Sequence, residues 1–154
     1  MDELRVMTTF FIMPGDALKS LHSELGKLTG KEIAKGILFR FGFRCGESVI
    51  KRMGMKLKGN ERIEEKLPAL WAEFGLGRLE ILESSKDELA IKFEESVEAL
   101  ALDEQKEPSC DFTRGYLAGV VSSLTSKKYY GVEKSCIAKG DSSCLHFLKL
   151  FQKE

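Results

Sequence analysis

Three of the four cysteines in this 154-residue chain lie in its last third, with one carboxylate between them at a fixed spacing. Cys110, Glu133, Cys136 and Cys144 follow the pattern Cys-x22-Glu-x2-Cys-x7-Cys. Zinc and similar ions prefer a tetrahedron of thiolates with an occasional nitrogen or carboxylate oxygen. The four side chains therefore match the ligand count of one ion. Because four protein ligands fill the coordination sphere, such an ion would be structural and not catalytic.

A shared site also depends on how these residues are placed locally. Cys136 and Cys144 flank a predicted turn through residues 139–141, and Cys110 lies where a helix is expected to begin. Glu133 and Cys136 are three residues apart, which puts them on opposite faces of a regular strand. A bulge, or the end of the strand near Cys136, is needed to bring them together. Spacing alone leaves two alternatives: three unrelated buried thiols, or a disulfide between Cys136 and Cys144.

Composition and charge limit the class of protein and its partners. The chain has 24 basic and 24 acidic residues, so net charge gives no reason to expect a nucleic-acid partner. A basic run at residues 51–58 is followed at once by acidic residues, which indicates a solvated helix face and turn. No apolar run reaches the about 20 residues that a membrane helix needs, and the acidic N-terminus argues against a signal peptide. We therefore expect a cytoplasmic protein with reduced cysteines and no membrane partner.

The chain is predicted to begin with one strand and one helix. Residues 5–13 are rich in β-branched and aromatic side chains and stop at Pro14-Gly15, which predicts a strand. Asp16 is the expected N-cap of a helix with leucines at helical spacing, and Gly30 is its expected end.

Two more helices are expected before the sheet. The apolar stripe from Ile33 to Met53 predicts a long helix, and its glycines indicate a kink or the close approach of another backbone. Asn60 is the expected cap of a further helix that carries Trp71, with a kink or restart at Pro68.

From residue 79 the apolar period changes from 3.6 to 2. Residues 79–93 predict a hairpin with one buried face, and residues 95–108 have a weak signal. A helix from Ser109 or Asp111 has an apolar face and a face of small residues. Two strands, about 128–136 and 143–151, complete the chain, and both faces of the last one are apolar, which indicates a central strand. This order predicts an α+β fold, an antiparallel sheet of two hairpins covered by helices, in a single domain over residues 1–154.

Aromatic residues are the candidates for an apolar ligand pocket, although each also suits an ordinary core. Trp71 is the first choice, because a kinked helix leaves room beside it and its indole offers one donor. His146 shares a strand face with Cys144, so it could support or replace a metal ligand, or be an ordinary buried histidine. Cys45 lies on an apolar stripe, where a small core residue is favoured over a reactive or acylated thiol. The pocket candidates are Trp71, Phe74, Phe41, Phe93, Tyr116 and His146.

Residues 110–147 resemble the 4-vinyl reductase domain family. The shared features are a cysteine, Gly-x3-Gly in a helix at Gly115 and Gly119, Glu-x2-Cys, and Gly-Asp-x2-Cys-x-Phe. The resemblance implies a small-molecule-binding domain related to the sensing parts of bacterial regulators that bind phenols and other aromatics. It also implies a fold similar to that of TRAPP-complex subunits, and dimerisation through helices.

The same resemblance implies zinc bound by the four residues named at the outset, since the corresponding side chains hold zinc in those sensors. The sensors carry ATPase and DNA-binding regions after this domain, whereas this sequence ends at Glu154. We therefore expect any output to pass through an effector protein or a homodimer.

Three functions compete at this stage. A zinc-stabilised binding or sensing domain for a small apolar or aromatic ligand is preferred. A protein-interaction or assembly module, in the manner of the trafficking subunits, is the alternative. A vinyl-group reductase is the least favoured, because no Gly-x-Gly-x-x-Gly follows a predicted strand to bind a nicotinamide or flavin cofactor.

Overall fold

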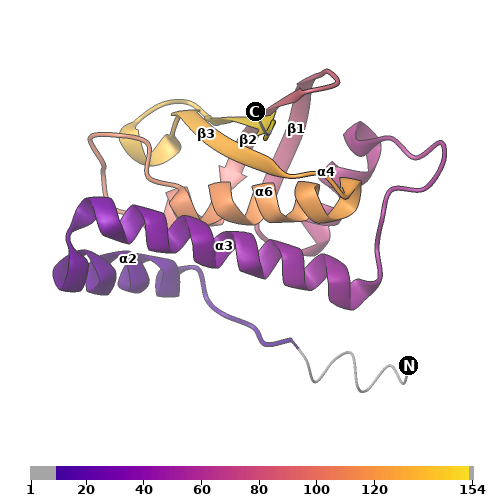
Figure 1. Cartoon of the computed structure of the whole chain (residues 1–154). Helices are drawn as coiled ribbons and strands as arrows, with labels where there is room; N and C mark the ends of the chain where they lie inside the picture. Colours follow the sequence, from indigo (N-terminus) through magenta and orange to yellow (C-terminus); the bar gives the residue numbers. More distant parts are fainter. Residues whose placement is uncertain (1–9, 153–154) are drawn as a thin grey trace.

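The computed structural model describes residues 10–152, which form one four-stranded antiparallel sheet with helices packed on one side of it (Figure 1). The helices are α2 (Asp16–Thr29), α3 (Lys31–Met53), α4 (Ile63–Glu73), α5 (Val97–Ala101), α6 (Asp111–Thr125) and the short 3₁₀ helix η1 (Ile137–Lys139). The strands are β1 (Gly77–Ser84), β2 (Glu88–Ser96), β3 (Tyr129–Ser135) and β4 (Cys144–Leu150). The predicted α+β class and both predicted hairpins are confirmed.

The strand order is β1-β2-β4-β3, so the two hairpins join through β2 and β4. In this central pairing Leu89 lies opposite Leu148, Ile91 opposite His146, and Phe93 opposite Cys144. The prediction that the last strand is central is therefore correct. The join also brings the side chain of Cys144 next to that of Phe93, one of the pocket candidates.

The two faces of β4 differ in burial, although both are apolar. Cys144, His146 and Leu148 are buried, whereas Leu145 and Phe147 on the opposite face are partly exposed. Figure 1 shows the reason, because α2, α3 and α6 all lie on the same side of the sheet. The face that carries Cys144 and His146 is thus the one that the helices cover.

Helix α6 is the centre of the molecule, between the sheet and α3. Its packing on α3 depends on glycines in both helices. A Cβ atom added at Gly115 would lie 2.0 Å from the carbonyl oxygen of Phe39, and one at Gly42 would lie 2.2 Å from that of Phe112. Gly46 and Gly119 meet the facing backbone in the same way. The expected close approach of another backbone is confirmed at these positions, but Gly36 has open space around it.

Several predicted helix details are wrong. Gly15, not Asp16, is the N-cap of α2, and Asp16 is the first helical residue. The N-cap of α4 is Arg62, not Asn60, because Asn60 lies within a turn closed by a hydrogen bond from Glu61 N to Lys58 O. The helix does not restart at Pro68, since α4 is one helix through it.

The predicted N-terminal strand is only partly covered by the described residues. Residues 10–13 have no helix or strand structure, and Ile12 is fully exposed, so this part of the prediction is wrong. An apolar segment needs a partner strand to form a ladder, and residues 10–13 pair with no strand of the sheet. The remainder of the predicted strand lies outside the described residues. Within residues 10–152, no helix is both long and apolar enough to cross a membrane.

Candidate metal centre and aromatic cluster

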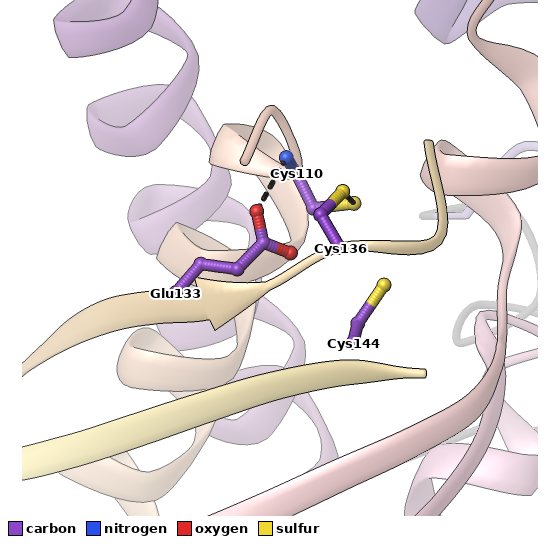
Figure 2. A group of neighbouring side chains, drawn as sticks. All are labelled: Cys110, Glu133, Cys136 and Cys144. Carbon is purple, nitrogen blue, oxygen red and sulfur yellow. Dashed lines mark hydrogen bonds between the residues drawn. The ribbon is translucent and has the colours of Figure 1, made fainter. Parts of the chain in front are cut away.

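The four candidate metal ligands come together at one end of the sheet (Figure 2). Cys110 is the N-cap of α6, and Glu133 lies near the end of β3. Cys136 immediately precedes η1, and Cys144 is the first residue of β4. Their ligand atoms all lie within 4.8 Å of one another. The site therefore joins the start of a central helix to the loop of the last hairpin.

The expected break in strand geometry is present between Glu133 and Cys136. The β3–β4 register shifts between Glu133 and Ser135, and β3 ends at Ser135. The chain then turns through η1, where Gly140 has a φ of 104° that a residue with a side chain rarely adopts. The backbone amide of Cys136 donates to the Asp141 carboxylate at 2.8 Å, which fixes the loop. The irregular strand end thus turns Glu133 and Cys136 to the same side.

The sulfur spacing fits a tetrahedral ion. Zinc–sulfur bonds of about 2.3 Å give a tetrahedron with edges of about 3.8 Å. The Sγ atoms of Cys110 and Cys136 are 3.7 Å apart. All four cysteines of the chain are free thiols, so the alternative of a disulfide between Cys136 and Cys144 is not found in the structure.

Glu133 has one carboxylate oxygen in use and one available. Its Oε1 accepts a hydrogen bond from the backbone amide of Cys110 at 3.0 Å. Its Oε2 is buried, has no hydrogen-bond partner, and lies 3.2 Å from His146 Nε2. An unpartnered buried oxygen beside three thiols is the donor that a metal ion would use. His146 is placed to orient this carboxylate, as histidine and carboxylate partners around metal sites commonly do.

The three thiols perturb one another when no cation is present. Hydrogen bonds from Cys110 and Cys144 hold the pKa of Cys136 well below its ordinary value. The hydrogen bond to Cys136, with burial, raises the pKa of Cys110. A hydrogen bond from Cys110 lowers the pKa of Cys144, but the hydrogen bond with Cys136 and burial outweigh it and raise the pKa to about 12. The site thus favours one thiolate shared among three sulfurs, and a divalent cation is what would allow the others to ionise.

Five of the six pocket candidates form a contiguous aromatic cluster between α4, α6 and the inner face of the sheet. The Trp71 ring centroid is 5.5 Å from that of Phe93 and 5.6 Å from that of Tyr116. Phe74 packs on both Trp71 and Tyr116, and Phe93 lies 5.2 Å from the His146 ring. We call Trp71, Phe74, Phe93, Tyr116 and His146 the aromatic cluster.

The cluster contains buried polar atoms that have no partner among the described residues. These are Trp71 Nε1 and both ring nitrogens of His146, and both side chains are completely buried. Leaving a buried donor unpaired costs about 1–3 kcal/mol. The cluster borders the metal centre, because His146 lies against Glu133 and Phe93 lies opposite Cys144 in the sheet.

Two residues from the sequence analysis lie outside the cluster. Phe41 is half exposed on α3 and touches only its fringe, through Phe112. Cys45 is half buried on the same helix, packs beside Leu18 and Leu38, and has its pKa raised by burial. Three surface pockets of residues 10–152 are lined by residues outside the cluster, and the side chains of Trp71, Phe93 and His146 within it are completely buried.

Sequence reasoning missed Glu98, a completely buried carboxylate. It accepts hydrogen bonds from the amides of Phe112 and Thr113 at the start of α6, and it lies 2.6 Å from His22 Nε2. The sequence does contain a signal for the helix α5 that carries Glu98. Ser96 is a good N-cap by residue type, and its hydroxyl accepts a hydrogen bond from Ala99 N at the start of α5. A helix of five residues is too short to show an apolar period, so residues 95–108 looked like a loop.

Two family models match consecutive parts of the chain. The model described as "Activator of aromatic catabolism" matches residues 6–87, and the 4-vinyl reductase domain model matches residues 89–150. An uncharacterized protein of Methanocaldococcus jannaschii is 26% identical over 106 residues, which are 68% of this chain. The chain spans only 65% of that relative's length.

Solved structures share the fold at low sequence identity. The phenol-responsive sensory domain of the transcription activator PoxR, solved with phenol, has a TM-score of 0.75 at 24% identity and covers 92% of this chain and 76% of that one. A vinyl-4-reductase family protein of M. jannaschii has a TM-score of 0.58 at 22% identity, covering 75% and 68%. Trafficking protein particle complex subunit 3 of Naegleria fowleri, covalently bound to palmitic acid, has a TM-score of 0.67 at 14% identity, covering 90% and 95%.

The resemblance drawn from the sequence is thereby confirmed, and so is the expected similarity to a TRAPP subunit. One family model covers more than half of the chain, and the second begins where the first ends. The chain therefore belongs to the activator of aromatic catabolism family, and its residues 89–150 match the 4-vinyl reductase domain model.

Proposed function

We propose that this protein is a zinc-stabilised domain that binds a small aromatic or apolar molecule within the aromatic cluster. The observation that carries the proposal is Trp71 Nε1, an unpartnered donor that is completely buried among aromatic rings. A ligand with an aromatic body and one oxygen would satisfy this donor while adding ring contacts. Membership of the activator of aromatic catabolism family supports the same class of ligand.

Ligand entry would require part of the cluster to move. Trp71, Phe93 and His146 are completely buried, whereas Phe74 and Tyr116 are only partly buried. Rotation of these two rings would open space beside Trp71 without exposing the sheet. The hydroxyl of a phenol could then accept from Trp71 Nε1 and donate to a ring nitrogen of His146. The phenol bound by the sensory domain of PoxR is an example of this ligand chemistry.

Binding is tested with two ligands of nearly equal shape, phenol and toluene. We expect calorimetric titration to give phenol about tenfold higher affinity, because only its oxygen pairs with the buried donor. Trp71 is the one tryptophan of the chain, so its fluorescence reports on the cluster directly. In Trp71→Phe the preference for phenol should disappear. Failure of phenols to bind at all, or an unchanged preference in this variant, would overturn the proposal.

Zinc is proposed at Cys110, Glu133, Cys136 and Cys144 because the donor set, the sulfur spacing and the free Glu133 oxygen all suit it. The ion would supply structural charge and would not take part in chemistry. It would hold the start of α6 against the β3–β4 loop, and thereby fix Tyr116 and His146 on two walls of the cluster.

Elemental analysis of the purified protein tests the metal. We expect about one zinc per chain in the wild type and in Cys45→Ser, which removes a thiol distant from the site. Cys136→Ser should lose the zinc and melt at a lower temperature, since structural zinc binding is coupled to folding. Equal zinc in Cys136→Ser and the wild type would exclude the four-ligand site.

Self-association through α3 is proposed as the way in which ligand binding in one copy of the protein affects a second copy. Ile33, Ile37 and Phe41 are spaced by four residues on this helix and remain 61%, 39% and 47% exposed. Such a stripe on one helix face is a surface that another copy, or an effector protein, would cover. The alternative function, an assembly module, is supported by the same exposed stripe. In that case the partner would be a different protein and not a second copy of this chain.

A further inference from the structure

A large surface recess is formed by residues outside both the candidate metal centre and the aromatic cluster. It has a volume of about 950 Å³ and is formed by the second half of α3, the end of α6, the start of β3 and residue 151. Volumes of this order are typical of sites for small ligands. None of the five cluster residues lines it.

Positive charge gathers in this recess, although the whole chain is neutral. Six cationic side chains line it, against one carboxylate, that of Glu47. These cations are Arg40, Arg44, Lys51, Lys56, Lys127 and Lys128. They come from two regions of the chain, residues 40–56 and residues 127–128, and Lys51 and Lys56 belong to the basic run at residues 51–58. Folding therefore creates a local excess of five positive charges, by the count of six cations less one anion.

The single carboxylate does not neutralise most of these cations. Glu47 Oε1 lies 3.2 Å from Arg44 and 3.7 Å from Lys51. Within residues 10–152, no carboxylate lies within 4 Å of the other four cations, Arg40, Lys56, Lys127 and Lys128. Like charges held around one recess raise the local potential and attract an anion.

The recess also has an apolar floor. Its aromatic lining comprises Phe39, Phe43, Tyr129, Tyr130 and Phe151. The Phe39 and Phe43 rings are 6.4 Å apart and tilted, and Lys128 Nζ lies 5.4 Å from the Phe151 ring centroid. Tyr130 and Phe151 are 42% and 51% exposed, so their faces are available to a ligand. The combination suits a molecule that is anionic at one end and apolar at the other.

An added peptide strand is a poor fit, even though β3 is an edge strand of the sheet. The outward backbone groups of β3 beside the recess are already in use by α6. Tyr129 N donates to Ser122 Oγ at 2.9 Å, and Gly131 O accepts from Arg114 at 3.0 Å. With its edge covered in this way, β3 cannot extend its ladder here.

We propose that this recess is a second ligand site, which binds a small organic anion: a carboxylate or phosphate on an aromatic or aliphatic body. Arg40 and Arg44 line the recess from α3, Lys127 and Lys128 line it from the segment between α6 and β3, and together they would hold the anionic group. The aromatic floor would take the body of the molecule. A concave recess of this volume selects a single small molecule and not a flat bilayer. The site goes beyond the proposed function, with which it shares no residue.

The test uses 2-naphthyl phosphate as the probe, with inorganic phosphate and neutral 2-naphthylmethanol as its two halves. We expect calorimetry to show that the complete probe binds more tightly than either half. Its affinity should fall as the concentration of sodium chloride is raised. The double variant Arg40→Gln/Lys128→Gln should weaken probe binding by about tenfold or more, because it removes one cation from each side. Both residues are exposed, so the fold should be kept.

A matched control makes the same change of charge elsewhere. Lys86→Gln/Lys106→Gln alters two exposed lysines outside the recess and should bind the probe as the wild type does. Equal losses in the two double variants, no probe binding, or inorganic phosphate binding as tightly as the probe would each overturn the site. Binding to anionic phospholipid vesicles without binding of the free probe would also overturn it, in favour of membrane docking.

The proposed anion site and the proposed aromatic-ligand site can be tested independently of each other. Trp71→Phe should leave probe binding unchanged, and the Arg40→Gln/Lys128→Gln variant should leave the preference for phenol over toluene unchanged. Loss of probe binding in Trp71→Phe would place the probe in the aromatic cluster and overturn a separate site.

Discussion

Glu98 shows how one buried side chain links three helices. Its carboxylate, carried on α5, accepts two amides at the first turn of α6, where a negative charge is favourable to the helix dipole. On its other side it meets His22 of α2 at 2.6 Å. Because α6 begins next to Cys110, this carboxylate also fixes the position from which the Cys110 side chain, a candidate metal ligand, extends.

Replacement of Glu98 by alanine should be strongly destabilising. The change leaves two buried amides and His22 without their acceptor, and we expect the free energy of unfolding to fall by about 3 kcal/mol or more. Urea denaturation of Glu98→Ala against Glu95→Ala, which truncates an exposed carboxylate on β2, measures the effect. Similar stability of the two variants would contradict the role given to Glu98.

Helices α3 and α6 are the pair of elements on which the rest of the fold depends. Their backbones meet at four glycines, and each of these positions has a carbonyl oxygen of the facing helix where a Cβ would lie. Such close contact fixes the register of one helix along the other. The recess and the aromatic cluster lie on different sides of this pair, so both depend on the register.

Adding one methyl group at this contact should separate the helices. In Gly115→Ala the new Cβ would lie 2.0 Å from Phe39 O, and backbone cannot move aside cheaply. We expect a loss of about 2–4 kcal/mol in the free energy of unfolding. Gly36→Ala on α3 is the control, since nothing lies within 4 Å of its added Cβ, and helix propensity predicts a gain of about 0.5–1 kcal/mol. Chemical denaturation that ranks the two variants in the opposite order would refute this account.

On the surface of the whole molecule, α3 carries the exposed apolar stripe of Ile33, Ile37 and Phe41. If a second copy covers this stripe, a charge placed in it should dissociate the dimer. We expect light scattering coupled to size exclusion to show dimers for the wild type and monomers for Ile37→Glu. Ser20→Glu adds the same charge at an exposed site on α2 and should remain dimeric. A monomeric wild type would exclude the dimer, and would leave the stripe for a different chain.

Local features were predicted well because their signals lie within a few residues. The spacing of Cys110, Glu133, Cys136 and Cys144, together with the family resemblance, predicted that these side chains come together. The strand break required before Cys136 is met by the register shift there. Helix caps were predicted less well. Asp16 and Asn60 are good caps by type, but packing of the following helix decided where each helix starts.

Contacts between residues distant in the sequence could not be predicted from local patterns. The apolar period predicted both hairpins, but nothing in the sequence of β2 or β4 specifies that these two strands pair. Their pairing buries Ile91 and His146 on a common face of the sheet, and this burial favours it. Likewise, Trp71 could be ranked as a pocket residue, but that its donor is left unpaired depends on the residues of three other elements around it.

The sequence by itself determined the elements with strong periods, the four residues of the candidate metal centre and the family, because each depends on residue types at characteristic spacing. Only the tertiary structure decided which elements are neighbours, and with them the recess where Arg40, Lys56 and Lys128 share one surface. Charges separated by tens of residues interact only after packing brings them within about 10 Å, the distance over which salt screens them. A neutral chain can therefore carry a strongly positive site that its composition does not reveal.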